Sequence, residues 1–316
     1  MWRYVIKRLL LMVFSFFVIM TISFFLIRLV PDPVKCTPTE PTCQAIKAWR
    51  EELGYNKPII VQYWLYLGKV FQGNWGIGFK MYRAQEVTDV LFSKLPYTMY
   101  VNFWSSIIAI PVGIGLGIYS ALKKNKWQDS LISVLVMLVI SVPSYVYCFI
   151  IQYFLCFRWG LFPYATDVGS AFFDPHFFYS YMPPILCLSL GTIAGLTRFT
   201  RAELTEALTS EYMLLARAKG LTRGQATVRH ALKNAMVPIF PMIIGEFISI
   251  IGGSLIVEKF FSIPGVGGLF LDSISQVDTN FFMFLSMFYV AIGLVASLIV
   301  DLSYGWIDPR IRMGAR

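Results

Sequence analysis

Apolar stretches with few or no charges recur along this chain, each about as long as the ~20 residues that a helix needs to cross a bilayer. Six are predicted to span: Leu9–Val30, Pro96–Leu122, Ser130–Cys156, Phe177–Thr197, Ala235–Val257 and Phe281–Val300. The first is longer than the apolar region of a signal peptide and precedes no small-residue cleavage site, so we expect a retained anchor. The pattern predicts an all-α polytopic membrane protein with six transmembrane helices.

Two long polar segments separate these spans. In the outer segment, from Pro31 to Lys94, apolar residues recur at helical spacing after Pro58, which predicts an amphipathic helix on the membrane surface. They are Ile59, Ile60, Tyr63, Trp64, Leu67, Val70 and Phe71. We expect an N-terminal part over residues 1–95 and a five-span core over residues 96–316, with an inner loop at 198–235.

Composition and charge support this interpretation. Hydrophobic residues make up 57% of the chain and charged residues 14%, which is more apolar than a soluble domain. The net charge of +9 would suit nucleic acid, but the basic residues fall between apolar runs, as expected of cytoplasmic loops. They are Arg3, Lys7, Arg8, Lys123, Lys124, Lys126, those of the inner loop, and Arg310, Arg312 and Arg316. Both termini are therefore predicted to be cytoplasmic, with lipid and not nucleic acid as a partner.

The chain carries no recognisable catalytic chemistry. Gly73–Lys80 is rich in glycine but lacks the Gly-Lys-Ser/Thr ending of a phosphate-binding loop. With only His176 and His230, neither a metal site nor a Ser-His-Asp site is expected. We therefore expect no enzyme, catalytic residue, metal or cofactor in this chain.

The five cysteines are too few for a disulfide scaffold. Cys36 and Cys43 fall outside the predicted spans, where a disulfide and two free thiols remain equally open. The other three, Cys148, Cys156 and Cys187, lie in apolar runs and are expected to pack as small hydrophobic residues.

The inner loop reads TEALTSEYMLLARAKGLTRGQATVRHALKNAMVP from Thr205 and predicts two short helices. Ser210 is placed to cap the first, which would run from Glu211 to Lys219 over ~13 Å and stop at Gly220. Thr222 and Gln225 have the spacing of a capping box for the second helix, which would continue into the fifth span.

One face of the first helix would carry Tyr212, Leu215, Ala216 and Lys219. Two interpretations remain open from periodicity alone: the face fills a groove on a partner protein, or the helix rests on lipid headgroups.

The ARAKGL and RHALKNAMVP segments of this loop resemble the cytoplasmic "EAA" loop of ATP-binding-cassette importer permeases, in the form used by the oligopeptide, dipeptide and nickel branch. That form lacks the acidic start and the final proline, and Leu214 and Lys233 occupy those places here. Three further stretches are similar to the same branch: MWRYVIKRLLLM at the start, VEKFFSIPGVGGLFLDSI from Val257, and DLSYGWIDPRIR from Asp301. The start departs from many members in reading Pro-Asp-Pro where they have Pro-Gly-Asp-Pro.

The resemblance implies a permease subunit in a prokaryotic cell membrane. Beside the membrane lipid that the composition predicts, it implies three kinds of protein partner: a homologous second permease, two cytoplasmic ATPase subunits and an extracytoplasmic solute-binding protein. The residues that would couple to an ATPase are Glu211, Tyr212, Leu215, Ala216, Arg217, Ala218, Lys219, Gly220 and Leu221. The Glu258–Gly268 loop would face the pore mouth, where Pro264, Gly265 and Gly267 form a stiff and then flexible turn.

Glu246 lies in the middle of a predicted span, where a carboxylate costs about 2.5–3.5 kcal/mol on insertion scales. It is expected either to line the translocation path or gate, or to pack as a neutral hydrogen-bonded group. The function expected overall is ATP-driven import of di- or oligopeptides. The alternatives are an importer of the same family for nickel or another small solute, and a secondary transporter driven by an ion gradient.

Overall fold

The computed structural model describes residues 2–29, 48, 51, 54, 56–169 and 171–307. Cys36, Cys43 and the three C-terminal arginines lie outside the described residues. Within the described ranges, five helices are long and apolar enough to cross a membrane, and a bent helix pair makes a sixth if it counts as one span. The predicted all-α polytopic fold is confirmed, with its third span broken.

The chain divides into two compact units. The N-terminal unit comprises residues 1–95 and 269–294, and the core unit comprises residues 96–268 and 295–316. The helices in chain order are α1 (Trp2–Ile27), α3 (Ile59–Phe71), α4 (Val87–Leu122), α5 (Trp127–Ser141), α6 (Ser144–Ile151), η1 (Gln152–Arg158), α7 (Pro175–Thr209), α8 (Glu211–Ala218), α9 (Arg223–Ala226), η2 (Thr227–Leu232), α10 (Lys233–Ser249), α11 (Leu255–Phe260), α12 (Val266–Ser275) and α13 (Thr279–Ile307).

In the N-terminal unit, α3 is the amphipathic helix that the sequence predicts. Pro58 occupies the capping position just before its first residue. Its inner face packs on α1 and the start of α13 in a cluster that contains Phe24, Leu67 and Met287. Its outer face leaves Trp64 67% exposed, as expected of a helix that contacts a membrane surface.

A buried carboxylate fixes the segment that follows α3. Asp278, which is fully buried, accepts hydrogen bonds from the backbone amides of Phe79, Lys80 and Met81 at 2.8, 2.8 and 3.1 Å. Three N–H donors on one oxygen compensate for the cost of burying the charge. The turn at residues 79–81 is therefore attached to the start of α13, a contact that the sequence analysis missed.

The predicted span Ser130–Cys156 is wrong as a continuous helix. It divides into α5 and the α6–η1 segment, which meet at 104°. Pro143 lacks an N–H and excludes Val142 from the helical region, and Val142 is extended with φ −86° and ψ 128°.

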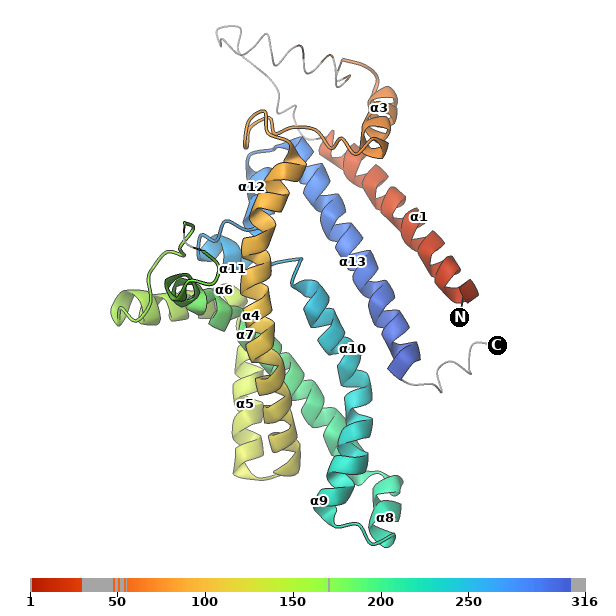
Figure 1. Ribbon diagram of the computed structural model, residues 1–316, viewed down its shortest axis with the longest axis vertical. Coiled ribbons are helices and arrows are strands. Elements are labelled where there is room, and N and C mark those ends of the chain that lie inside the picture. The colour runs from red at the N-terminus through yellow and green to blue at the C-terminus, as the bar shows by residue number, and fades with distance from the viewer. Residues whose placement is uncertain are drawn as a thin grey trace. The chain divides into compact units, whose positions relative to one another are not determined.

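Two other boundaries differ from expectation. Helix α7 continues to Thr209, twelve residues beyond the predicted end of its span, so much of the expected inner loop is helical. Helix α10 ends at Ser249, and a turn containing Gly253 at φ +68° separates it from α11, so Ala235–Val257 is not one helix. Figure 1 shows α10 leading to α9 and α8 at one end of the core unit.

Helices α4 and α7 cross closely in the core unit because α4 carries glycine at the contact. A Cβ on Gly117 would lie 2.6 Å from Thr200 Cβ, and one on Gly113 would lie 2.9 Å from Leu196 Cβ. The Thr197 hydroxyl also donates to the Gly113 carbonyl at 3.1 Å. The four-residue spacing of small residues is typical of close helix packing in membranes.

We expect Gly117→Ala to lower the thermal unfolding temperature in mild detergent, because the new methyl group forces α4 away from α7. Overpacking of this kind costs about 1–3 kcal/mol. Gly115→Ala is the matched control, since its Cβ would meet nothing within 4 Å. Equal melting temperatures for both variants would contradict the close crossing.

An ion pair joins α5 to α7. Arg201 donates from Nε and Nη2 to the two carboxylate oxygens of Asp129 at 2.5 and 2.8 Å. Ser120 Oγ and the Asn125 amide donate to the same carboxylate at 2.5 and 3.1 Å. The α4–α5 turn and α7 are thus fixed to one buried group.

Candidate functional site

Helix α8 is fixed at its C-terminus by local hydrogen bonds. At its C-terminus Gly220 has φ +87°, its amide donates to the Arg217 carbonyl at 2.9 Å, and the Leu221 amide donates to Ala216 at 3.3 Å. This is a Schellman motif, which requires a left-handed residue where the sequence places glycine. The capping box of Thr222 and Gln225 then starts α9, as predicted.

The N-terminus of α8 differs from expectation. Ser210 occupies the capping position, but its hydroxyl donates to the Ala207 carbonyl at 2.6 Å and does not cap α8. The reason is that Ser210 also ends α7, whose last carbonyls lack helical partners. Glu211 lies in the first turn of α8, where a negative charge is favourable.

One side of α8 packs on its own chain. Met213 and Ala216 are 5% exposed and join a cluster with Leu204 of α7 and Ala226 and Ala231 of the following helices. The predicted partner-facing side is therefore wrong for Ala216, which lies on the inner side because α8 folds back against α7, α9 and η2.

The other side of α8 is apolar and exposed. Leu214 is 67% exposed, Leu215 58% and Tyr212 36%. Of the expected coupling residues, Glu211, Tyr212, Leu215, Arg217, Ala218, Lys219 and Gly220 are exposed, and Leu221 is half-buried. Leu214, Arg217 and Arg223 also line a shallow depression beside the Gly220 turn. Exposed leucines flanked by arginines on a rigid tip form a surface suited to an apolar groove with an acidic rim.

The expected pore-mouth loop is organised around Glu258, which is 1% exposed. Thr98 Oγ1 donates to one carboxylate oxygen at 3.0 Å, and the Ser254 amide donates to the same oxygen at 3.3 Å. The Gly267 and Gly268 amides donate to the other oxygen at 2.7 and 3.3 Å. Burial raises the pKa of this carboxyl, and the Thr98 and backbone donors offset part of that rise.

The glycines of this loop make room for the carboxylate. A Cβ on Gly265 or on Gly267 would lie within 3.0 Å of Glu258 Oε2. Both glycines are buried, and Pro264 is half-buried. Glu258 is thus an internal anchor that holds the loop in one shape, and the place of the loop beside the pore mouth stays a prediction.

Glu246 of α10 is half-buried and accepts a hydrogen bond from Thr192 of α7 at 3.4 Å. Its carboxylate accepts fewer hydrogen bonds from the described residues than that of Glu258. The arrangement is compatible with either alternative raised by the sequence, a path-lining group or a packing group.

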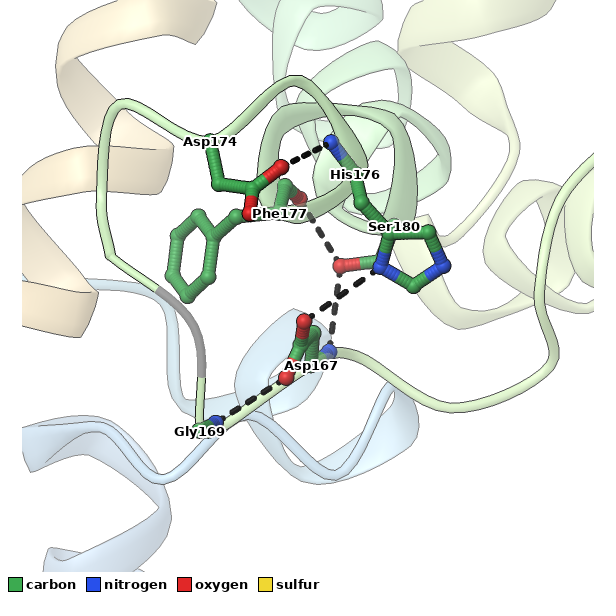
Figure 2. A network of polar contacts seen from close by, with 6 residues as sticks. All are labelled: Asp167, Gly169, Asp174, His176, Phe177 and Ser180. Atoms are coloured by element: carbon green, nitrogen blue, oxygen red, sulfur yellow. Dashed lines mark hydrogen bonds and ion pairs between the residues drawn. The ribbon is translucent and has the colours of Figure 1, made fainter.

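A polar network that the sequence analysis missed fixes the loop before α7 (Figure 2). Asp167 accepts from the Gly169 amide at 2.9 Å, lies 3.4 Å from His176 Nδ1, and donates its own amide to Ser180 Oγ at 3.0 Å. Asp174 caps the helix by accepting from the His176 amide at 2.8 Å. Because Ser180 is 2% exposed and donates to the Phe177 carbonyl, the network is structural and not a nucleophile site.

Membrane-length helices and an exposed apolar helix with a fixed C-terminus define the chain as a polytopic membrane protein with a candidate docking surface. The chain belongs to the family of binding-protein-dependent transport system inner membrane components, whose model matches residues 113–313. Residues 1–102 match the N-terminal model for membrane components of binding-protein-dependent transport systems. It is thus a multi-pass permease subunit of an ABC importer that works with other subunits in the inner membrane.

Curated relatives align along nearly the whole chain. The dipeptide transport system permease protein of Lactococcus lactis subsp. cremoris is 34% identical over 98% of this chain and 99% of its own. The glutathione transport system permease proteins of Shigella flexneri and Escherichia coli strain K12 are 32% and 31% identical, over 99% of both chains in each case.

A solved structure supports the fold. A crystal structure of an amino acid ABC transporter with histidines aligns at a TM-score of 0.52 and 18% identity, over 68% of this chain and 92% of that one.

Proposed function

We propose that this chain is a permease subunit of an ATP-driven importer of di- or oligopeptides and forms half of the translocation path. The observation that carries the proposal is the exposed apolar side of α8, which is braced by a Schellman motif and a capping box. The names of the aligned dipeptide and glutathione permeases support a peptide-like substrate.

The proposed assembly contains a homologous second permease, two cytoplasmic ATPase subunits and an extracytoplasmic solute-binding protein. ATP hydrolysis takes place in the ATPase subunits, because this sequence lacks a phosphate-binding loop. Both termini face the cytoplasm of a prokaryote, as the basic segments favour. The α8 tip then lies on the same side as the ATPases.

The proposed mechanism is alternating access. Closure of the two ATPases on ATP moves α8, and α7 and α10 transmit the movement because α8 packs against α7 and η2, which continues into α10. Glu246, Pro264, Gly265 and Gly267 are proposed to lie along or beside the path. Glu258 acts as a positioning residue that fixes the loop.

Transport by the complete assembly tests the proposal. The chain is co-expressed with its neighbouring-gene products and reconstituted in proteoliposomes, and uptake of labelled dipeptides, oligopeptides, glutathione and nickel is measured. We expect ATP-dependent uptake of a peptide that persists when ion gradients are collapsed by ionophores. Uptake that needs an ion gradient and no ATP would overturn ATP-driven import, and uptake of nickel alone would overturn the peptide substrate.

A further inference from the structure

A groove between α5 and α7 in the core unit has no role in the proposed transport cycle. Its volume is about 230 Å³. Ile132, Val136 and Met137 of α5 form an apolar wall, and Arg198 and Arg201 of α7 supply the charge. A groove that is apolar along one helix and basic on the other suits an amphipathic anion.

The Asp129 contacts place this groove at the edge of the membrane. Asp129 binds both Arg201 and the Asn125 amide, so Arg201 is level with the α4–α5 turn. That turn carries Lys123, Lys124 and Lys126, and clustered lysines mark the membrane–water interface. Met137 lies eight residues along α5 from Asp129, about 12 Å further along the helix axis and away from the lysine turn.

Both arginines have N–H donors that are bound to no described residue. Arg201 is held by Asp129 through Nε and Nη2, while its side chain stays 33% exposed and its remaining N–H groups are bound to no described residue. Arg198 is exposed, and its side chain makes no hydrogen bond or ion pair within the described part of the chain. Asp129 neutralises one arginine, so the groove keeps a net positive charge that favours an anion.

We propose that this groove binds an anionic phospholipid, with its phosphate between Arg198 and Arg201 and an acyl chain along Ile132, Val136 and Met137. Arginine suits phosphate because its planar donors bind two oxygens at once. Basic pockets between membrane helices at the headgroup level are typical sites for anionic lipids. A free phosphate would satisfy the arginines but leave the apolar wall uncovered, which favours the lipid.

Native mass spectrometry of the complete transporter, in detergent with equal amounts of phosphatidylglycerol and phosphatidylcholine, tests the site. We expect the native assembly to retain phosphatidylglycerol about fivefold over phosphatidylcholine, and Arg198→Gln to remove that preference. Met137→Trp fills the groove from a residue that is 56% exposed, and should expel the lipid without disturbing the fold. Arg158→Gln, an equal loss of charge at the end of η1, should change nothing.

Three results would overturn the proposal. Equal effects of Arg198→Gln and Arg158→Gln would mean that net charge alone attracts the lipid. Displacement of phosphatidylglycerol by excess inorganic phosphate, with Met137→Trp having no effect, would identify a soluble phosphate group as the ligand. Crosslinking of a photoreactive residue at position 137 to another subunit, and not to lipid, would make the groove a subunit interface.

Discussion

Leu215→Asp is expected to separate this permease from its proposed ATPase subunits. Leu215 is 58% exposed on the outer side of α8, so the substitution removes no internal packing. A carboxylate in the apolar centre of a protein interface costs about 2–4 kcal/mol, which weakens association roughly 30- to 1000-fold. ATPase that co-purifies with the tagged permease should therefore fall below detection, and ATP-dependent uptake should fall with it.

Val228→Asp is the matched control for this prediction. Val228 is 64% exposed on η2, in the same loop but outside α8, so the same type of charge is added nearby. Val228→Asp should retain the ATPase subunits, and both variants should keep the native melting temperature. Retention of the ATPase by Leu215→Asp, or equal loss from both variants, would contradict a specific docking role for α8.

The conformation of α8 could be predicted from the sequence because its determinants are local. The Gly220 stop and the Thr222–Gln225 box involve residues within a few positions of each other. The sequence could not predict which side of the helix is buried. Ala216 is buried because α8 packs against Leu204 and Ala231, and that packing depends on where α7 and η2 lie.

Several contacts that could not be predicted from the sequence join distant parts of the chain. Asp278 binds amides 197 to 199 residues away, and Glu258 binds Thr98 across 160 residues. Gly117 matters only because Thr200 lies opposite it. No local pattern identifies such partners, so a buried carboxylate can be predicted to need donors without those donors being known.

Helix breaks at proline could not be predicted from the sequence either, for a different reason. Pro96, Pro111 and Pro238 lie inside continuous helices, whereas Pro143 follows the point at which α5 ends. Each proline removes one helical hydrogen bond, but in a membrane neighbouring groups can satisfy the freed carbonyl. A proline therefore marks where a helix can break, and whether the helix does break depends on the groups packed around it.

Glu258→Gln is expected to disorganise the loop from Ser254 to Gly268 and to abolish transport. Both oxygens of Glu258 accept hydrogen bonds, from Thr98 and Ser254 on one side and from Gly267 and Gly268 on the other. A glutamine amide has a single acceptor oxygen, so its NH₂ group would face at least one backbone amide: that of Ser254 if the oxygen stays with the two glycines, or those of Gly267 and Gly268 if it does not. Leaving such groups unpaired costs about 1–3 kcal/mol each. The melting temperature should fall, and hydrogen exchange at the Gly267 and Gly268 amides should accelerate.

Glu246→Gln provides the matched comparison, because it makes the same chemical change at a half-buried residue of the same unit that accepts one hydrogen bond, from Thr192. The new amide would keep an oxygen for the Thr192 hydroxyl, so the melting temperature should stay near that of the native protein. A large drop in uptake without loss of stability would then place Glu246 along the translocation path, while unchanged uptake would make it a packing residue. If Glu258→Gln were as stable as Glu246→Gln and left the loop amides protected, Glu258 would not be the anchor of the loop. Comparing the two glutamates thus separates a residue that shapes the path from one that lines it.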